Sequence, residues 1–471
     1  MKRKIHLLTA ALLTACLLYS YAAPARATAV DSDYTLWQDY TREALTGDLS
    51  DIVSADSNIL AWSSSYTLGA YCRAYQATGE KIYLEKAGGY LYQIFRLAAD
   101  NDGDGYRNWG TGTYSGGKYD EYCVHTGALL SSAGEWANLA RSSPGILGEI
   151  EPTSNMTYAA LCDYLVAEAT GQLIPAFDRD WSRLLGIYMN RPGSGNYDGT
   201  TKPISLPNNQ FLAMAAALIQ FAKLSPAHEA QYLCRARRML SAFHCKLRYN
   251  CRGDITRWYY KNLYFPFDRQ GAAEDYSHGM WSARAAIMGY ANGLAFKNSD
   301  IEAFARVYKS MLRGTDEEPL LTWYTDGSGS QDNALFLFIY DLSPFGDAIW
   351  RAGYKTAVFR GNERSGDAAR ILAYHEAAPA PLAFAPLIPA PGAKLGGRTL
   401  FRWEPSVYAC KYTLQISDRA DFTRLLVDRE NILDPCAFVE GLPKGKALYW
   451  RVIAGNQGGG AYTSEAVAVS T

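Results

Sequence analysis

The sequence predicts a mostly helical protein, in which six or seven helical hairpins close into an (α/α) toroid, followed by a small all-β domain. Two observations support this class. Between Leu60 and Gly361 a helix that is poor in charge repeatedly precedes one that is amphipathic. After the uncharged stretch 377–386, which is rich in proline and alanine, the pattern changes to short alternating strands.

The clearest predicted hairpin joins helices at 60–77 and 81–96. The first carries a single charge, whereas the second places its apolar residues on one face. The same pattern returns at 211–223 and 229–247, where Tyr232-Leu233-x-x-Ala236 repeats Tyr83-Leu84-x-x-Ala87. The copies are 149 residues apart (232 minus 83), which is room for about three hairpins of fifty residues. Such a repeat predicts a ring of inner and outer helices over 28–376, with the cleft formed by loops at one rim.

Three short strands are predicted after the linker, at Phe401–Trp403, Tyr412–Ile416 and Tyr449–Ile453. The segment 387–471 resembles a fibronectin type III module. The resemblance implies a spacer or attachment unit, so we assign no chemistry to it.

The first 27 residues have the features of a secretory signal. Three basic residues precede the apolar run 5–23, and Ala25-Arg26-Ala27 forms a cleavage site, so we expect cleavage after Ala27. In the alternative interpretation Leu13-Thr14-Ala15-Cys16 is a lipoprotein box, which would place a lipid anchor on Cys16. No later stretch is long and apolar enough to predict a transmembrane segment. We therefore expect an exported chain, secreted or periplasmic, that is soluble or tethered by one lipid.

The composition narrows the classes of partner. Lys and Arg number 46 and Asp and Glu 47, a balance that argues against a general nucleic-acid binder. The 34 Tyr and 11 Trp suit a carbohydrate cleft, although an aromatic core would give the same count. Cys245 with Cys251 and Cys410 with Cys436 are the candidate disulfides. Neither a Cys-x-x-Cys pair nor clustered histidines occur, so no zinc site is expected.

The strongest candidate site is Glu274-Asp275-Tyr276-Ser277-His278-Gly279, a polar loop before an apolar run that is predicted to be helical. It is either a helix cap or a catalytic segment. Further candidates lie at predicted helix starts, in loops or beside aromatic residues: His125, Asn209, Gln210, Arg257, Tyr260 and Tyr324.

Asp100-Asn101-Asp102-Gly103-Asp104-Gly105 is similar to the start of a calcium loop. It places oxygens at alternate positions and glycine at the sixth, but the twelfth position is Thr111 rather than a bidentate Glu. Ca²⁺ at Asp100, Asp102 and Asp104 is therefore a candidate ligand. The nearby Trp109 is a candidate for a sugar subsite.

Five ordered motifs together resemble one family. They are Leu60-Ala61-Trp62-(x3)-Tyr66, Ala77-Thr78-Gly79-(x3)-Tyr83-Leu84, Val124-His125-Thr126-Gly127, Leu206-Pro207-x-Asn209-Gln210 and Glu274-Asp275-x-Ser277-His278-Gly279. Over 60–329 the chain resembles the helical-toroid lyases of polysaccharide lyase family 38, which act on glucuronan and alginate. It departs from them at Ser63-Ser64-Ser65 and Asn208, and these departures bear on substrate preference.

The resemblance implies β-elimination on a uronic-acid polysaccharide, without a required metal or other cofactor. A base removes the C5 proton, the uronate carboxylate takes up charge, and the C4 oxygen leaves with a proton. His278 is the expected base and Tyr324 the expected proton donor, with His125 as a further catalytic candidate. Substrate binding is expected from Asn209, Gln210, Arg257, Trp62, Trp109 and Tyr260, and Glu274 is expected to orient His278 or Arg257.

Three other functions remain open. A glycoside hydrolase would use two carboxylates, such as Glu274 or Asp275 with Asp120 or Glu121. A uronyl C5-epimerase would share the first proton abstraction. A non-catalytic glycan-binding protein would need only the aromatic subsites.

Overall fold

The computed structural model describes most of the chain after the predicted signal sequence. The described residues are 42, 45–143, 145–190, 204–264, 271–314, 319–332, 342, 380–406, 408–409, 411–455 and 460–471. The predicted signal sequence 1–27, Cys16, Cys410, nearly all of 333–376 and the first residues of the predicted linker 377–386 lie outside the described residues.

Helices form most of the chain between residues 57 and 311. They are α3 Ser57–Ile59, α4 Ser65–Thr78, α5 Lys81–Phe95, α6 Cys123–Arg141, α7 Tyr158–Glu168, α8 Asn208–Leu224, α9 Glu229–His244, α10 Tyr276–Ala291 and α11 Asn298–Met311. Shorter turns of π or 3-10 helix are η1 Ser50–Ile52, η2 Leu60–Ser64, η3 Ala169–Leu173 and η4 Pro175–Asp180. The predicted hairpins 60–77 with 81–96 and 211–223 with 229–247 are thus confirmed as helix pairs, with shifted ends.

Helices α6 and α8 pack in parallel at very short range. A Cβ on Gly127 of α6 would lie 2.5 Å from the backbone nitrogen of Met214 in α8. At the other end of the pair, Arg141 Nη1 donates a hydrogen bond of 2.9 Å to the carbonyl of Leu224. The N-terminal parts of α6 and α8 therefore contact each other, and so do their C-terminal ends. Small residues allow this approach, since α8 is rich in alanine and buried almost throughout.

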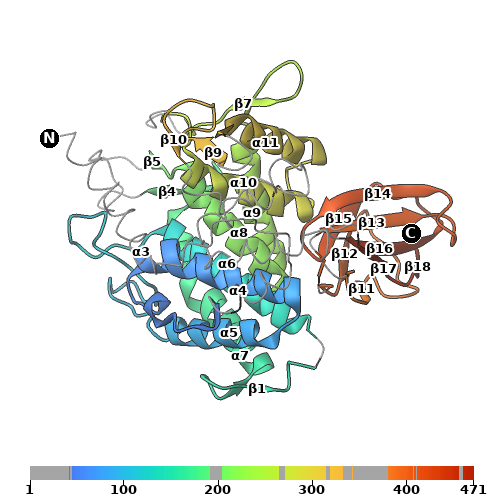
Figure 1. Cartoon of the computed structure of the whole chain (residues 1–471), viewed down its shortest axis with the longest axis horizontal. Helices are drawn as coiled ribbons and strands as arrows, with labels where there is room; N and C mark the ends of the chain where they lie inside the picture. The colour runs from blue at the N-terminus through green and yellow to red at the C-terminus, as the bar shows by residue number, and fades with distance from the viewer. Residues whose placement is uncertain are drawn as a thin grey trace. The chain divides into compact units, whose positions relative to one another are not determined.

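Helix α10 joins the pair with the same direction. Met280 and Trp281, from its second turn, share a buried cluster with Ala213 of α8 and Ala128 of α6. The first turns of α6, α8 and α10 consequently lie together. Figure 1 shows these three helices in the middle of the helical part of the chain.

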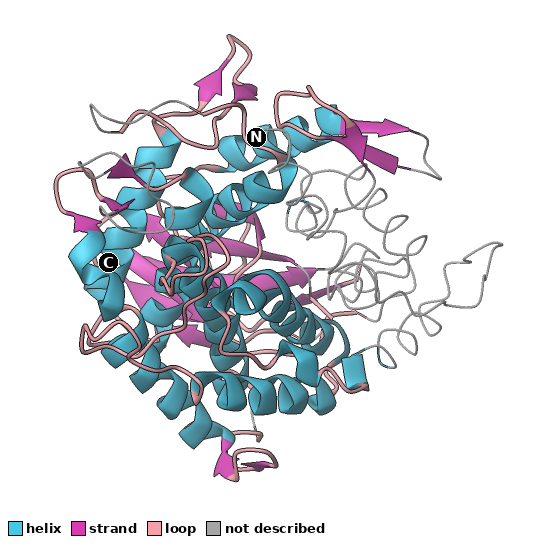
Figure 2. Cartoon of the chain, turned by 90° about the vertical axis from the view of Figure 1, so that its left-hand side faces the viewer, coloured by secondary structure: helices cyan, strands magenta, loops and turns pink. Residues whose placement is uncertain are grey.

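The predicted toroid of six or seven hairpins is wrong. The described residues do not form a clear ring of hairpins. Short antiparallel strands come between the helices along the chain, and in Figure 2 the small magenta strand pairs lie around the edge of the helices. These strands are β1 Ile150–Glu151, β2 Met156–Thr157, β3 Trp181–Ser182, β4 Ile187–Asn190, β5 Ile204–Ser205, β6 Arg248–Tyr249, β7 Ile255–Arg257, β8 Leu312–Gly314, β9 Pro319–Thr322 and β10 Gln331–Asp332. They pair as β1-β2, β3-β4-β5, β6-β7 and β10-β9-β8. Strands this short contain too few residues to show an alternating pattern in the sequence.

The C-terminal region is largely strands, and all three predicted strands are confirmed. The strands are β11 Pro386–Ile388, β12 Arg398–Trp403, β13 Lys411–Ser417, β14 Leu425–Ile432, β15 Cys436–Glu440, β16 Ala447–Gly455, β17 Ala461–Thr463 and β18 Val467–Ser470. One antiparallel sheet has the order β11-β12-β15. The other has the order β14-β13-β16-β17, with β18 also on β16. Phe401, Trp403, Leu414 and Trp450 form a core of their own with other apolar residues.

Charged and polar contacts connect this strand region to the last turns of the helices. Asp434 lies 3.4 Å from the ammonium of Lys223 and accepts a 2.9 Å hydrogen bond from Asn292 Nδ2. The Cys436 thiol contacts Asn292 Oδ1 at 3.1 Å. Side chains of the strand region therefore form an ion pair and hydrogen bonds at the C-terminal ends of α8 and α10.

The candidate disulfide between Cys245 and Cys251 is not formed, since both residues are free thiols, as is Cys436. Among the helices that the structure describes, none combines the length and apolar character required to cross a bilayer.

The close contact of α6 and α8 predicts that Gly127→Ala destabilises the protein. The new methyl group would meet backbone atoms of Ala213 and Met214, so the helices must separate, at a cost of about 1–3 kcal/mol. Urea denaturation measures the change. Gly171→Ala is the matched control, because no atom lies within 4 Å of its Cβ position, and equal losses in both variants would contradict the packing argument.

Candidate functional site

Three helix starts bring the predicted site residues together. His125 is in the first turn of α6, Asn209 and Gln210 in the first turn of α8, and His278 in the first turn of α10. The side chains of Tyr122 and Pro207 do not cap α6 and α8. The dipole of a helix gives its N-terminal end a positive potential, which favours a nearby anion.

His278 forms a short contact with Asp275. Its Nδ1 lies 2.6 Å from Asp275 Oδ2, and Asp275 Oδ1 caps α10 by accepting from the backbone N–H groups of Ser277 and His278. Burial alone would raise the pKa of Asp275, but the hydrogen bond and charge of His278, with help from Ser277, hold it below its ordinary value. An ionised carboxylate can only accept, so Nδ1 carries a proton, and Nε2 is the ring nitrogen that does not face Asp275. The His278 side chain is 39% exposed, which leaves it accessible to a substrate. The cap and the catalytic interpretations of this segment are therefore compatible, because Asp275 serves in both.

Tyr260 lies directly beside this pair. Its ring centroid is 4.8 Å from that of His278, and the side chain of Gln210 lies near its hydroxyl. Burial raises the pKa of Tyr260, and Gln210 offsets only part of that effect. The phenol therefore keeps its proton and can donate it. Sequence reasoning placed Tyr260 among the substrate-binding residues and gave the proton-donor role to Tyr324.

Asn208 connects the amide segment to Tyr260. Its backbone N–H donates to the carbonyl of Tyr260 at 2.9 Å, its Nδ2 donates to the carbonyl of Tyr259, and its Oδ1 accepts from Tyr264 at 2.9 Å. These three hydrogen bonds hold the segment 259–264 against the start of α8. Sequence analysis noted this residue only as a departure from the family pattern.

His125 lies within a group of aromatic rings. The ring centroids of Trp62, Tyr114 and Tyr122 are 5.4, 5.6 and 4.9 Å from that of the imidazole. Its Nδ1 is 2.9 Å from Ser57 Oγ. Burial lowers the pKa of His125 to about 3, so the imidazole is neutral. A group this weakly basic is unsuited to the catalytic proton transfer predicted for it, but suits a neutral hydrogen-bonding role.

Tyr114 joins this aromatic wall from a distant loop. It accepts a hydrogen bond from Trp62 Nε1 at 3.2 Å and donates one to Asn58 Oδ1 at 2.6 Å. Sequence analysis missed both Tyr114 and Ser57. The polar residues just before the predicted helix at Leu60 were the only local signal.

Glu274 is fully buried, unlike its neighbour Asp275. Its Oε2 accepts hydrogen bonds from Trp258 Nε1 and, at 2.8 Å, from Ser282 Oγ. Burial raises the pKa of Glu274 well above its ordinary value. Asp275 is the carboxylate that contacts His278, so the orienting role predicted for Glu274 belongs to its neighbour.

The remaining predicted residues lie at different depths. Trp109 is 1% exposed, packs edge-on against Phe95 and donates to the carbonyl of Ile94, so it offers no face to a sugar. Tyr324 is half-buried, and its backbone forms a β-bridge with Asp275. Arg257 is exposed and lies 3.3 Å from Asp326, two residues beyond Tyr324.

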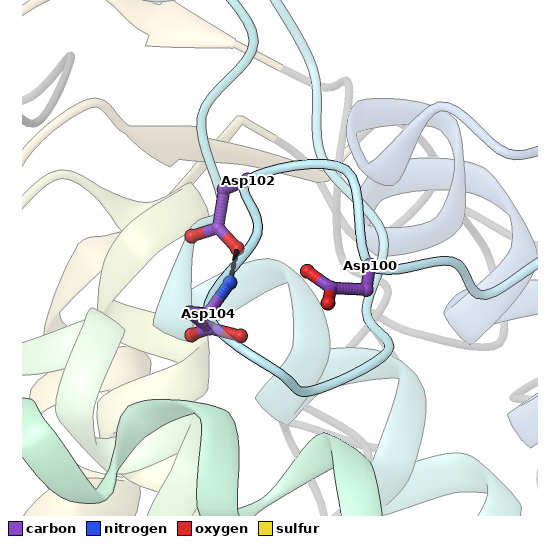
Figure 3. Close-up of side chains that lie close together, drawn as sticks. All are labelled: Asp100, Asp102 and Asp104. Atoms are coloured by element: carbon purple, nitrogen blue, oxygen red, sulfur yellow. Dashed lines mark hydrogen bonds between the residues drawn. The ribbon is translucent and has the colours of Figure 1, made fainter.

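The three aspartates of the calcium-like loop do lie close together, with carboxylate oxygens within 4.8 Å of one another (Figure 3). Arg179 already forms ion pairs with Asp102 and Asp104, at 3.0 and 2.7 Å. Asp100 accepts from the backbone N–H groups of Gly103 and Gly105. These contacts compensate part of the negative charge of the cluster, and calcium at Asp100, Asp102 and Asp104 stays a prediction. We assign no function to calcium.

A scan of protein-family models finds none that matches this sequence, and a search of curated proteins finds no match either. The arrangement of side chains is therefore the basis for assigning a function.

The buried imidazole of His125 predicts a specific pH dependence of stability. Its folded pKa, about 3, is below the ordinary 6.5, so the unfolded chain takes up a proton first and stability is lost as the pH falls from 6.5 toward 3. His125→Gln removes this loss. The difference in unfolding free energy between variant and wild type should be constant above pH 7. Below pH 6 the variant should gain up to about 1.4 kcal/mol per pH unit relative to the wild type. Denaturant titrations at several pH values measure it, and a pH-independent difference would contradict a neutral buried imidazole.

Proposed function

We propose that the protein is an exported polysaccharide lyase that cleaves a uronic-acid polysaccharide, glucuronan or alginate, by β-elimination. The observation that carries this proposal is the contact of Tyr260 with the His278–Asp275 pair, with the Gln210 amide near the hydroxyl of Tyr260. A base and a neutral proton donor in contact are the two groups that elimination requires.

The chemistry can be assigned atom by atom. Nε2 of His278 takes the C5 proton, and the electrons of that C–H bond form the C4=C5 double bond while the C4–O bond breaks. The departing oxygen takes the proton of Tyr260. Proton transfer from the imidazolium to the phenolate restores both groups. Asp275 stabilises the imidazolium, since it remains ionised beside Nδ1. Tyr324, whose backbone pairs with Asp275, is the second candidate for the donor.

The surroundings of this pair favour an anionic sugar. Removing the C5 proton moves negative charge into the uronate carboxylate, which must be stabilised. Asn209, Gln210 and the neutral His125 are buried around the site and add no negative charge, and the starts of α6 and α8 add positive potential. Trp62 and Tyr114 provide flat faces for sugar rings.

The proposal is tested by near-ultraviolet absorbance of the purified protein with glucuronan, alginate and a neutral glucan. Elimination creates a conjugated 4,5-unsaturated uronyl end that absorbs there, and we expect absorbance to rise on a uronan only. New reducing ends without absorbance would instead indicate a hydrolase. Binding without either product would indicate a glycan-binding protein.

His278→Ala and Tyr260→Phe should each lower kcat by about 10²–10⁴-fold with the fold retained, because each removes one proton-transfer group. Initial rates measure the change in kcat, and circular dichroism measures whether the fold is retained. His228→Ala and Tyr249→Phe are matched controls from outside the site. Tyr324→Phe tests the second candidate, and a larger loss there than in Tyr260→Phe would move the donor role to Tyr324.

A further inference from the structure

Asn208 is fully buried in the first turn of α8, and the mechanism above does not use it. We propose that Asn208 is a positioning residue, whose hydrogen bonds fix the backbone on both sides of Tyr260 and so hold its phenol beside His278. The effect of Asn208 on catalysis rests on the proposed function, whereas its effect on the backbone of 258–262 does not.

The contacts of Asn208 fix both peptide groups that flank the Cα atom of Tyr260. Its Nδ2 donates to the carbonyl of Tyr259, which belongs to the peptide group before that atom. Its backbone N–H donates at 2.9 Å to the carbonyl of Tyr260, which belongs to the peptide group after it. Because the two peptide planes determine the φ and ψ of a residue, they also determine the direction in which its side chain leaves the backbone. Asn208 therefore contributes to the placement of the Tyr260 ring, whose centroid lies 4.8 Å from that of His278.

The side-chain amide of Asn208 has one orientation that satisfies its neighbours. The carbonyl of Tyr259 can only accept a hydrogen bond, so it requires the NH2 end of the amide. The hydroxyl of Tyr264 donates to Oδ1 at 2.9 Å. The Tyr264 ring packs edge-on against Phe211 of α8, with 5.8 Å between the ring centroids. Tyr264 therefore keeps the donor end of Asn208 directed toward Tyr259.

The same backbone segment is also paired with residues that lead to α10. The N–H of Tyr260 donates at 3.1 Å to the carbonyl of Ala272, three residues before Asp275. This pairing connects Tyr260 to the start of α10, and Asn208 connects it to the start of α8. Loss of the second connection would let the segment 258–262 shift relative to α8, and the phenol would shift with it.

Hydrogen exchange measured by mass spectrometry tests the structural part without any substrate. The variant is Asn208→Leu, since leucine has nearly the same shape as asparagine but no hydrogen-bonding atoms in its side chain. We expect the amides of 258–262 to exchange at least about tenfold faster than in the wild type, because the carbonyl of Tyr259 and the hydroxyl of Tyr264 lose this partner.

Asn138→Leu is the matched control. Asn138 also donates from Nδ2 to backbone carbonyls, those of Gly134 and Gln220, but it joins the later turns of α6 and α8. This variant should leave exchange at 258–262 at the wild-type rate. Unchanged exchange at 258–262 in Asn208→Leu, or an equal increase throughout α6, α8 and α10, would overturn the proposal.

If Asn208→Leu does not fold, Tyr264→Phe gives the same test in milder form. It keeps a ring beside Phe211 but removes the hydrogen bond that orients the Asn208 amide. Exchange at 258–262 should rise about threefold, and wild-type exchange in that variant would overturn the proposal.

The catalytic part is measured separately, as kcat on a uronan in a double-mutant cycle with Tyr260→Phe. Asn208→Leu alone should lower kcat about 10–10²-fold, because a small displacement of a reacting group has an effect of that order. In the Tyr260→Phe background the same substitution should change kcat by less than about threefold, since the displaced ring no longer carries a proton to transfer.

Equal losses of kcat in the two backgrounds would show that Asn208 acts on catalysis without Tyr260, and would overturn the positioning role. Faster exchange at 258–262 with an unaltered kcat would overturn it as well. A wild-type protein without lyase activity would refute the proposed function and leave the exchange result standing.

Discussion

The site depends on the close parallel packing of α6 and α8. Gly127 lets the two backbones approach until no side chain fits between them, and α10 aligns with the pair through Ala213, Met280 and Trp281. Parallel helices place all their N-terminal ends at the same side. His125, Asn209 and His278 are 153 residues apart in sequence from first to last (278 minus 125), yet this packing brings their helix starts together.

The electrostatics of the site follow from unequal burial. Two adjacent carboxyl groups, Glu274 and Asp275, have pKa values that move in opposite directions. Glu274 is fully buried and accepts from Trp258 and Ser282, whereas Asp275 has a histidine and the N–H groups of a helix start as partners. His125 and Tyr260 are held neutral by burial. An ionised carboxylate that is paired with a histidine, among neutral hydrogen-bonding groups, can support a proton transfer.

Sequence alone predicted the features that are local. The helix pairs and the three C-terminal strands follow from periodicity, and the segment from Glu274 to Gly279 stood out because polar groups are concentrated in it. Partners that are distant in sequence could not be predicted. Neither the contact of Tyr260 with His278 nor that of Tyr114 with Trp62 leaves a sequence pattern. The sequence does not show whether Glu274 or Asp275 faces the histidine, because this depends on the conformation of the turn. It also does not distinguish a buried tryptophan such as Trp109 from one that lines a sugar subsite. The prediction of a toroid was wrong because strands of two to four residues are too short to give an alternating pattern in the sequence.

The contacts of Asp434 bear on whether the helical part and the strand region can be separated into independent domains. A spacer module could be removed at the linker with little effect on the rest. Here Asp434 neutralises Lys223, which is only 12% exposed, and also binds Asn292 at the end of α10. A chain that ends before residue 387 would lack Asp434. The ammonium of Lys223 would then have lost this counter-ion at the C-terminal end of α8, a helix that is buried nearly throughout. The helical part and the strand region should therefore be treated as one folding unit, in which proteolysis at the linker need not release two stable fragments.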